Sequence, residues 1–341
     1  MKKIFNPEST ELTHKVVGGD PSGIANFSQP SRVIYKTIYE GMLDRTWFPS
    51  QVDLSDDIKA MMNLRPEEVR FYELTFGKLI FNDSVITNRI MDNFNQYITD
   101  PIANACLARQ AFEESLHSQS YAFIGDDVLQ KANGDSEKVY NLFKTDDMLL
   151  KLASDINADY SSFDDGTEVN AGHLALGAIA NLALEGVSFP AGFLAIWSLG
   201  DKMKGSASMI TEISKDELGS HLPLYVNLYN HIHTDAKLDK PKYDKMAREM
   251  LIRATEREIE FLKYSSEGVL GYSVSSIENF MHWICNERFR ELGFELHYPK
   301  ANTTDGLVKI FKNYSQLNET KTNFFEGTVK NYSKQNLDMD F

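Results

Sequence analysis

Cysteine is scarce in this sequence. Among 341 residues only Cys106 and Cys285 carry thiols, and two distant cysteines provide neither a disulfide framework nor a cysteine metal site. A reducing compartment is therefore expected, and we predict a cytoplasmic protein. Positive charge is also in deficit, because 35 Lys and Arg stand against 49 Asp and Glu, for a formal net charge of -14. Such an acidic surface argues against nucleic acid as a partner, since phosphate binding needs clustered basic residues.

A secretory signal and a clear membrane span are lacking as well. The N-terminus, MKKIFNPEST, has two lysines with no apolar run behind them, so no signal peptide is expected. The run from 173 to 200 is long enough to cross a bilayer. However, Asn181, Glu185 and Pro190 lie near its middle, where an isolated carboxylate is costly in lipid. We expect a buried helix at the centre of a large bundle, with membrane insertion as the alternative.

Strand-like alternation of polar and apolar residues is nearly absent, and apolar residues recur instead at helical spacing. Pro66 opens the first long predicted helix, and Asp100-Pro101 provides an N-cap and a first-turn proline for the next. With 42% apolar residues the chain can bury a large core, and we predict an all-α fold. The pattern predicts helices over about 66–98, 101–125, 136–160, 168–200, 202–234, 241–265 and 273–292.

The two ends of the chain differ from this helical middle. Residues 1–30 are rich in glycine and proline and are predicted to form an extended arm, whereas residues 31–315 are predicted to form one helical domain. Residues 316–341 are polar and acidic without a sustained period, which favours a flexible tail. The tail closes in Met339 and Phe341 among aspartates, which is typical of a peptide that docks into a partner's groove. Simple fraying is the alternative.

Two glutamate–histidine pairs at the spacing of one helical turn are the most informative motifs. They are Glu114-x-x-His117 and Glu217-x-x-x-His221. Each pair places a carboxylate and an imidazole on one helix face, because residues three or four apart are neighbours on a helix. A single pair of this kind is usually a solvated surface pair, so either pair alone would indicate little.

Two further acids give the pairs their significance. Asp83 and Glu185 lie in segments so apolar that an unpaired charge there would be hard to tolerate. Together with the two pairs they make four carboxylates and two neutral imidazoles, which balance two divalent cations. This inventory matches the inward-facing ligands of dimetal carboxylate helix bundles. The ligands fall on four predicted helices, which would form the core bundle.

Some assignments stay open at this point. Glu113 competes with Glu114, because it lies at the other allowed spacing from His117. His231 and His233, near a helix end, are expected to face water. Oxygen ligands with one imidazole per metal favour iron or manganese over zinc, whose structural sites prefer thiolate and imidazole.

An oxidisable side chain is predicted beside the metals. Tyr121 follows His117 by four residues, which puts its ring one turn along the same helix face. Phe189 and Phe193 lie four and eight residues after Glu185, and Ile213 lies four before Glu217, so these three are expected to line the same cavity. A phenol enclosed by apolar groups beside a redox-active metal pair could hold a one-electron oxidised state. In most bundles a buried tyrosine merely packs and hydrogen-bonds.

Taken together, these residues resemble the radical-generating small (β) subunit of class I ribonucleotide reductase, within the ferritin-like superfamily. The resemblance covers most of the chain, from Trp47 in TWFPSQVD through Asp83, EESLHSQSY, LEGVSF and KDELGSH to the tail. It implies a ferritin-like bundle with a four-helix dimetal core and additional surrounding helices. The cofactor it implies is two iron ions, or alternatively Mn/Mn or mixed Mn/Fe.

The resemblance also assigns roles to single residues. Glu114 and Glu217 would bridge the two metals, and Tyr121 would match the family's radical tyrosine. One metal would be held by Asp83, Glu114 and His117, and the other by Glu185, Glu217 and His221.

A route for the radical is implied as well. Trp47 and Asp216 match the residues that, with His117, begin the path toward the partner, and Tyr332 matches the tail tyrosine that continues it. By this resemblance the metal pair activates O2 and the radical passes to a large α subunit. That subunit reduces ribonucleoside diphosphates to deoxyribonucleotides, binds the C-terminal tail, and works with a homodimer of small subunits.

The sequence departs from the family in its second pair, where the usual motif is Glu-x-x-His. One extra residue separates Glu217 from His221. Pro223 cannot donate to the carbonyl of Gly219, and Gly219 itself weakens a regular helix. We therefore predict a π-helical bulge across 217–221 that absorbs the extra residue and restores ligand convergence.

Pro190 similarly frees the carbonyl of Gly186 beside Glu185, so irregularity is expected in both ligand helices. Two rival functions remain. A ferritin-like oxidase or iron-storage protein would use the same ligands without needing Trp47 or the terminal peptide, and a purely structural scaffold would bind no metal.

Overall fold

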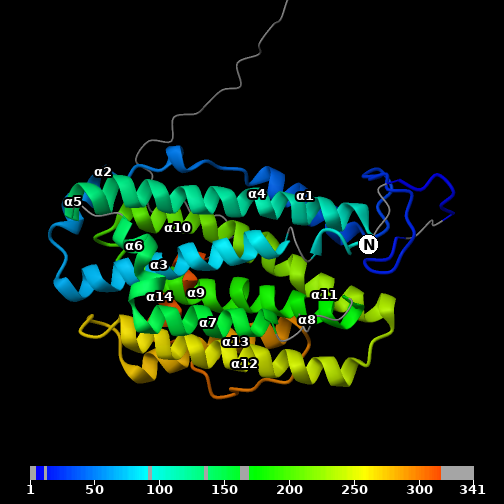
Figure 1. Ribbon diagram of the computed structural model, residues 1–341. Helices are drawn as coiled ribbons and strands as arrows, with labels where there is room; N and C mark the ends of the chain where they lie inside the picture. The colour runs from blue at the N-terminus through cyan, green and yellow to red at the C-terminus, as the bar shows by residue number, and fades with distance from the viewer. Residues whose placement is uncertain (1–4, 11–13, 91–93, 134–136, 162–168, 316–341) are drawn as a thin grey trace, which may run out of the picture.

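The computed structural model describes residues 5–10, 14–90, 94–133, 137–161 and 169–315. Within these ranges the regular secondary structure is helical, apart from an isolated antiparallel bridge between Val17 and Ile98. Long helices run side by side along one direction (Figure 1). In both ribbon views α1 and α4 lie along one side, α12 and α13 along the other, and α8 and α9 between them. The all-α prediction is confirmed.

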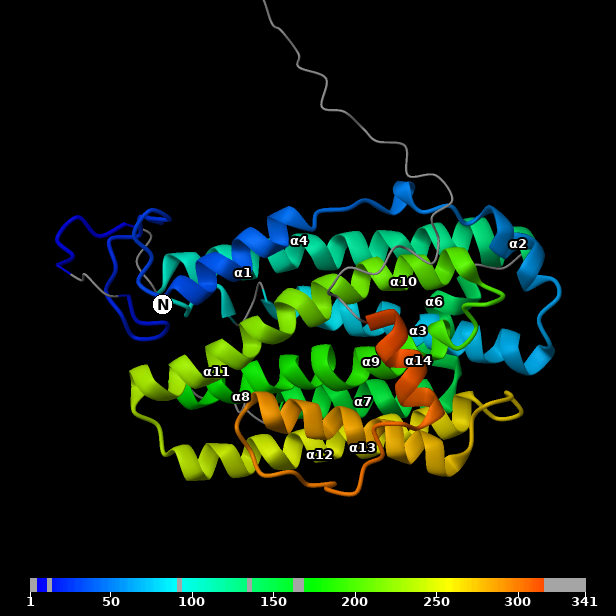
Figure 2. The same ribbon diagram turned by 180° about the vertical axis from the view of Figure 1, so that it is seen from behind.

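Four long helical stretches carry the predicted ligands. Two are the regular helices α3 (Pro66–Arg89) and α4 (Pro101–Ile124). The third joins α8 (Ala171–Ala183), the π-helix η4 (Leu184–Ser188) and α9 (Phe189–Trp197). The fourth joins α10 (Lys204–Asp216), the π-helix η5 (Glu217–His221) and α11 (Leu222–Ala236), and it is visible in Figure 2 as one continuous helix.

Shorter and outer elements surround these four. Before and between the ligand helices come α1 (Val33–Asp44), η1 (Pro49–Gln51), α2 (Ser55–Met61), η3 (Gly125–Gln130), α5 (Lys131–Asn133), α6 (Glu137–Thr145) and α7 (Asp147–Ser161). After them come α12 (Lys240–Ser265), α13 (Val274–Glu291) and α14 (Gly306–Ser315). The sequence pattern did not indicate α1, α2 or α14, of which α2 and α14 are short.

The helix starts follow the local signals. Asp100 caps α4 by accepting hydrogen bonds from the backbone N–H groups of Ile102 and Ala103, at 2.9 and 3.0 Å. The helix expected over 136–160 is interrupted at Asp146, because the Asp146 side chain accepts from Met148 and Leu149 and starts α7 as a new helix. The first long helix was expected to end near 98; its α-helical part, α3, ends at Arg89, and the described residues beyond it include Ile90 and Phe94 in π-helical conformation.

The apolar run that could span a membrane is the central helix of the bundle. The stretch Ala171–Trp197 is long and apolar enough to cross a bilayer, with a mean hydropathy of 1.5, and its most apolar window is entirely buried inside the protein. It packs against α11 and α12. The expectation of a buried core helix is confirmed, because protein side chains cover the apolar surface that lipid would otherwise meet.

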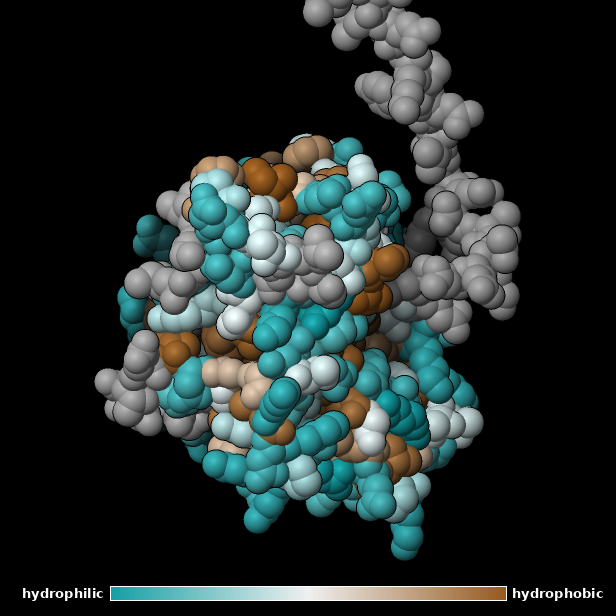
Figure 3. Space-filling view, turned by 90° about the vertical axis from the view of Figure 1, so that its right-hand side faces the viewer, coloured by the Kyte–Doolittle hydropathy of each residue, from teal (hydrophilic) through white to brown (hydrophobic). Residues whose placement is uncertain are grey.

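The N-terminal residues pack on one end of the bundle (Figure 1). Residues 14–32 form no helix, and the backbone N–H of Val16 donates to Asp235, which also pairs with Arg32 at 2.6 Å. Viewed from that end, the described surface is mostly hydrophilic with scattered hydrophobic patches (Figure 3). The predicted tail, 316–341, lies outside the described residues.

Candidate metal centre

Six side chains converge inside the four ligand helices. They come from α3 (Asp83), α4 (Glu114 and His117), η4 (Glu185) and η5 (Glu217 and His221), and all six are fully buried. They form two groups in which the possible ligand atoms lie within 4.8 Å of one another: Asp83, Glu114, His117 and Glu217 in one, and Glu114, Glu185, Glu217 and His221 in the other. Glu114 and Glu217 belong to both groups, which is the arrangement expected of two bridging carboxylates.

The π-helix predicted at the unusual pair is present. Segment η5 covers Glu217–His221, so the wider turn takes up the extra residue and both side chains still face the cluster. The second irregularity is η4, which carries Glu185 and ends two residues before Pro190. The Gly186 carbonyl, which loses its helical donor at Pro190, accepts instead from Arg288 Nη1 at 2.9 Å. The prediction that both ligand helices are irregular is confirmed.

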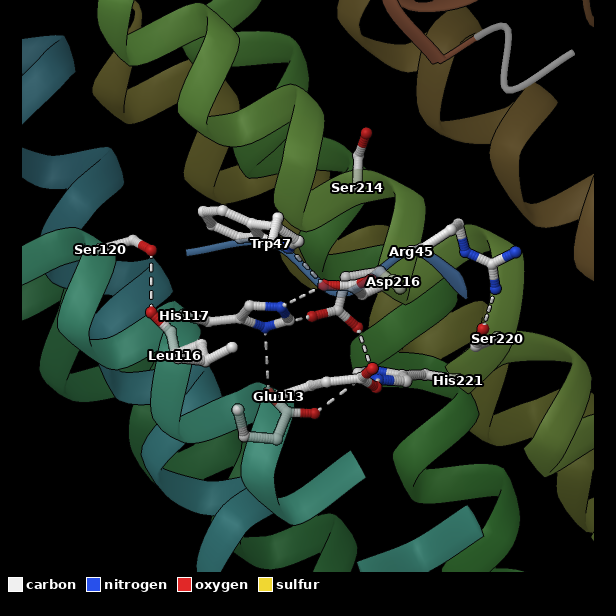
Figure 4. A network of polar contacts seen from close by, with 12 residues as sticks. Arg45, Trp47, Glu113, Leu116, His117, Ser120, Ser214, Asp216, Ser220 and His221 are labelled. Atoms are coloured by element: carbon white, nitrogen blue, oxygen red, sulfur yellow. Dashed lines mark hydrogen bonds and ion pairs between the residues drawn. The ribbon is translucent and has the colours of Figure 1, made fainter. Parts of the chain in front are cut away.

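Each histidine presents one ring nitrogen to the cluster and the other to an outer carboxylate (Figure 4). His117 Nδ1 lies 2.9 Å from Glu217 Oε1, and His221 Nδ1 lies 2.9 Å from Glu217 Oε2. On the outer side, His117 Nε2 lies 3.2 Å from Asp216 Oδ2, and His221 Nε2 lies 2.9 Å from Glu113 Oε2. An Nε2–H that donates to a carboxylate leaves Nδ1 free to bind a metal, as second-layer carboxylates do in metal sites.

Burial and mutual repulsion dominate the electrostatics of the acids. Burial and the charges of neighbouring glutamates raise the pKa of Asp83, Glu114 and Glu185 above the ordinary carboxyl range. Burial acts in the same direction on Glu217, but His221 and hydrogen bonds from its neighbours outweigh it and lower the Glu217 pKa. Several carboxylates this close together are stable in their charged form only when positive charge lies beside them.

The imidazoles respond in the opposite direction. Burial lowers the pKa of His117 and His221, but their carboxylate partners outweigh burial and raise both pKa values well above the ordinary range. The raised pKa values favour protons on the two imidazoles, whose positive charge offsets part of the carboxylate charge. Divalent cations would supply the same compensation.

Several oxygen atoms of the cluster have no hydrogen-bond partner of ordinary geometry. Both carboxylate oxygens of Asp83 and one each of Glu114 and Glu185 are buried in this state. Buried carboxylate oxygens without partners are costly, whereas hard oxygen donors with one imidazole per metal suit iron or manganese. The residues present therefore fit a pair of such metal ions.

A polar chain leads from His117 toward the protein surface. Trp47 Nε1 donates to Asp216 Oδ2 at 2.8 Å, and the same oxygen lies beside His117 Nε2. The Trp47 and His117 rings are stacked, with centroids 6.4 Å apart and an interplanar angle of 20°. Trp47 is only 6% exposed. The three residues thus form one contiguous series of contacts (Figure 4).

Tyr121 is buried beside the cluster. Burial and the nearby charge of Asp83 raise the pKa of the phenol well above its ordinary value, so the hydroxyl keeps its proton. Its ring makes an edge contact with Phe76, at a centroid distance of 5.9 Å. Sequence reasoning missed Phe76, although it lies two helical turns before Asp83 and so on the same face of α3.

The three residues predicted to enclose Tyr121 are all buried. Phe189, Phe193 and Ile213 have no exposed surface, and the two phenylalanine rings stack at 5.7 Å. Their contact with Tyr121 stays a prediction. Tyr332, predicted on the radical route, lies outside the described residues.

Two polar residues of the site were not anticipated. Gln110 donates to Glu185 Oε1 at 2.6 Å and to Glu114 Oε1 at 3.1 Å, and it accepts from the Tyr225 hydroxyl at 2.8 Å. Both could have been found, because Gln110 lies four residues before Glu114 and Tyr225 lies four after His221. Through these hydrogen bonds Gln110 holds Glu114 and Glu185, and Tyr225 in turn holds Gln110.

The histidines set aside in the sequence are more buried than expected. His233 is buried between the rings of Tyr229 and Tyr243, and His231 bonds to the Tyr35 hydroxyl at 2.7 Å. The prediction that they face water was wrong for His233, which is buried, and His231 is partly buried, because Tyr35 of α1 and Tyr243 of α12 contact this end of α11. The geometry favours Glu114 over Glu113 as the ligand, because Glu114 belongs to both groups of possible ligands, whereas Glu113 contacts the outer nitrogen of His221.

Comparisons with known proteins identify the family. The family model for the small chain of ribonucleotide reductase matches residues 26–305. The chain belongs to this family. A relative in Treponema pallidum (strain Nichols), the β subunit of ribonucleoside-diphosphate reductase, is 29% identical over 345 residues, which cover 99% of this chain and 97% of that protein. The β subunit of Halalkalibacterium halodurans is 25% identical over 344 residues, covering 100% and 97%.

A solved structure agrees with the sequence relatives. The ribonucleotide reductase R2 subunit from Clostridium botulinum superposes with a TM-score of 0.84 at 25% identity, covering 92% of this chain and 98% of that one. The ferritin-like fold is thereby confirmed. The protein is a small subunit of ribonucleotide reductase, an oxidoreductase whose family depends on a dimetal centre, and the alternative of an iron-storage protein is not favoured.

Proposed function

We propose that the six converging side chains hold two metal ions that serve radical generation. Asp83, Glu114 and His117 would bind the first ion, Glu185, Glu217 and His221 would bind the second, and Glu114 and Glu217 would be shared between them. Iron is the metal that we propose, with Mn/Mn or mixed Mn/Fe as alternatives, since these ions accept the same oxygen and nitrogen donors. The observation that carries this proposal is the convergence of six buried donors in two groups with two shared carboxylates.

When bound, the metal pair supplies oxidising power through its reaction with O2. The protein's share is to position Tyr121 and to shield it. The phenol is 2% exposed and is packed against Phe76, so water and reductants do not reach it. The charge of the Asp83 carboxyl group acts on the Tyr121 hydroxyl, and we assign to Asp83 the uptake of the proton when Tyr121 loses an electron. Tyr121 would then hold the radical.

The route to the partner begins at the polar chain of His117, Asp216 and Trp47. Direct contacts at 3.2 and 2.8 Å allow a proton to shift within the chain as an electron moves, and the stacked rings of Trp47 and His117 shorten the electron's path. From Trp47 the radical would continue to Tyr332 and the large α subunit, which reduces ribonucleoside diphosphates.

The partners follow from this role. The β-subunit relatives belong to ribonucleoside-diphosphate reductases, and we propose that this chain likewise works with a large subunit that binds residues 316–341. A homodimer of small subunits and a cytoplasmic location complete the proposal.

The test replaces the proposed radical residue. Tyr121→Phe removes only the hydroxyl, so the metal stoichiometry should stay at that of the unchanged protein while the tyrosyl signal in low-temperature electron paramagnetic resonance and turnover with the large subunit are lost. Tyr140→Phe is a matched control, because Tyr140 lies on α6 and is 38% exposed. Turnover retained in Tyr121→Phe would move the radical assignment from this tyrosine to the metals.

A second experiment separates the reductase from a dimetal oxidase. Removing about the last 20 residues takes away Tyr332 and the terminal peptide and leaves all six ligands. O2 consumption by the iron-loaded protein should persist while binding to the large subunit is lost. Unchanged binding would show that the tail is not the docking segment.

A further inference from the structure

The second histidine of the centre has an outer polar chain of its own. His221 Nε2 lies 2.9 Å from Glu113 Oε2, and the other oxygen of Glu113 accepts from Arg109 Nε at 3.0 Å. This chain parallels the one in which His117 meets Asp216. The two chains differ in the residue that contacts the carboxylate from outside: the indole of Trp47 donates to Asp216, and the guanidinium of Arg109 donates to Glu113.

Arg109 extends this chain to the segment that carries Trp47. Its Nη2 donates to Thr46 Oγ1 at 2.8 Å and to the carbonyl of Met42 at 3.3 Å. The Arg109 side chain is 13% exposed and lies over the Phe112 ring at 4.8 Å. The fork of the guanidinium therefore holds a carboxylate on one side and the end of α1 on the other.

A third contact ties the same segment to the neighbourhood of His221. Arg45 Nη2 donates to the Ser220 hydroxyl, one residue before His221 (Figure 4). Residues 45–47 lie between the end of α1 at Asp44 and η1, and the backbone N–H groups of Arg45 and Thr46 still donate to carbonyls of the last turn of α1. The side chains of Arg45, Thr46 and Trp47 tie this segment to the rest of the site, through contacts to Ser220, Arg109 and Asp216, respectively.

We propose that Glu113 and Arg109 are positioning residues that orient the His221 imidazole and hold residues 45–47, so that the second metal site and Trp47 keep one arrangement. The inference relies on the proposed dimetal function. A carboxylate on Nε2 selects the tautomer whose Nδ1 lone pair faces the cluster, and Arg109 compensates the buried charge of Glu113. Loss of such an outer partner typically weakens metal affinity by about 10- to 100-fold.

The first test measures Mn(II) binding by the full chain with the metal alone. Glu113→Gln keeps the shape of the side chain and removes its charge. Two Mn(II) should still bind, with the affinity for the weaker-bound ion lowered by about 10-fold or more. Glu278→Gln is the control. Glu278 is a half-exposed acid on α13 that pairs with Lys263 of α12. An affinity within about 2-fold of the unchanged protein would overturn the proposal.

The second test uses Arg109 and adds a measurement on the metal-free protein. Arg109→Met should lower Mn(II) affinity in the same direction and speed hydrogen–deuterium exchange of the peptide spanning 42–48 in the metal-free protein. Arg109→Lys keeps the charge beside Glu113 but loses the fork, so it should restore most of the Mn(II) affinity while exchange at 42–48 stays fast. Unchanged exchange in both variants would overturn the link to Trp47.

Failure of this inference is distinguishable from failure of the proposed function. If the unchanged protein binds fewer than two Mn(II), the dimetal centre itself is refuted. If it binds two and Glu113→Gln binds them equally well, the centre stands and Glu113 has no positioning role. If the Glu113→Gln variant fails to fold, judged by circular dichroism, Arg109→Met decides between these outcomes, because a lowered Mn(II) affinity supports the positioning role and an unchanged affinity overturns it.

Discussion

The two ligand helices that come first in the chain differ from the two that follow. Helices α3 and α4 are regular where they carry Asp83, Glu114 and His117. The other two widen into π-helices at Glu185 and across Glu217–His221, and each regains α-helical form just before a proline. One pair of helices thus reaches the cluster by ordinary spacing, and the other by a local change of helix geometry.

The difference shows what an irregular ligand helix needs from its surroundings. A π-helix leaves carbonyls without their usual helical donors, and long cationic side chains supply replacements at η4. Arg288 from α13 donates to the Gly186 carbonyl, and Lys78 from α3 donates to that of Ser188 at 2.6 Å. Lys78 also pairs with Glu258 at 2.8 Å, with both side chains fully buried.

The largest difference between the two kinds of ligand helix is expected when one residue is deleted from each. Removing Ser115, an exposed residue between Glu114 and His117 in regular α4, turns His117 by about 100° relative to Glu114 and should abolish binding of at least one metal. Removing Gly219 from η5 takes out the residue that the wide turn accommodates, so two metals should still bind. Isothermal titration with Mn(II) measures both stoichiometries. Equal loss in the two variants would mean that the π-helix does more than absorb one residue.

The next largest effect is expected at Lys78, which supports η4 from the buried core. Lys78→Met leaves Glu258 buried without its partner and should lower the free energy of unfolding by about 3–5 kcal/mol. Urea unfolding of the metal-free protein measures this change. Lys151→Met is the control, since Lys151 and Glu260 form a half-exposed pair. The double variant Lys78→Met/Glu258→Gln should recover much of the loss, and a double variant no more stable than the single one would contradict this account.

A smaller effect is expected at the carbonyl that Pro190 exposes. Arg288→Met removes the donor to Gly186 and should cost about 1–3 kcal/mol of unfolding free energy, the usual range for a buried polar group left without a partner. Arg290→Met on the same helix serves as the control, because Arg290 is half-exposed and pairs with Glu287. Thermal unfolding of the two variants side by side makes the comparison, and similar midpoints would show that the carbonyl finds another donor.

The smallest effect concerns an ion pair on α3 far from the cluster. Burial raises the pKa of Glu68, but hydrogen bonds from Lys202 and Arg65 outweigh it and lower the pKa to about 2 from an ordinary 4.5. A carboxyl with a lowered pKa adds stability that is complete above pH 4.5 and is lost as the pH falls toward 2.

Lys202→Met should therefore cost under about 1 kcal/mol at neutral pH, because the Lys202 side chain is half-exposed. Unfolding by urea at several pH values should show the gap between variant and unchanged protein narrowing below pH 4.5. A gap that stays constant down to pH 3 would reject the assigned pKa.

Much of the site could be predicted because helical periodicity relates spacing to direction. Glu114 and His117 share a face at any depth in a bundle, and the proline positions indicated where the other ligand helices become irregular. Phe76, Gln110 and Tyr225 also lie one or two turns from a ligand, so their spacing could have indicated them, although their residue types alone do not mark a metal site.

Other features depend on contacts between distant parts of the chain. No local pattern predicts contacts between residues on separate elements. Examples are the Lys78–Glu258 ion pair, the hydrogen bond from Arg109 to Thr46, and the packing that buries His233. The break at Asp146 is different, because an aspartate followed by two backbone donors is a local capping signal that the continuous apolar period concealed.

The most direct test of the central claim is anomalous diffraction from crystals loaded with iron or manganese, recorded at the absorption edge of the metal. The account predicts two peaks inside the bundle, one between Asp83, Glu114 and His117 and one between Glu185, Glu217 and His221, with Glu114 and Glu217 touching both. A single peak, or peaks away from these six side chains, would contradict it.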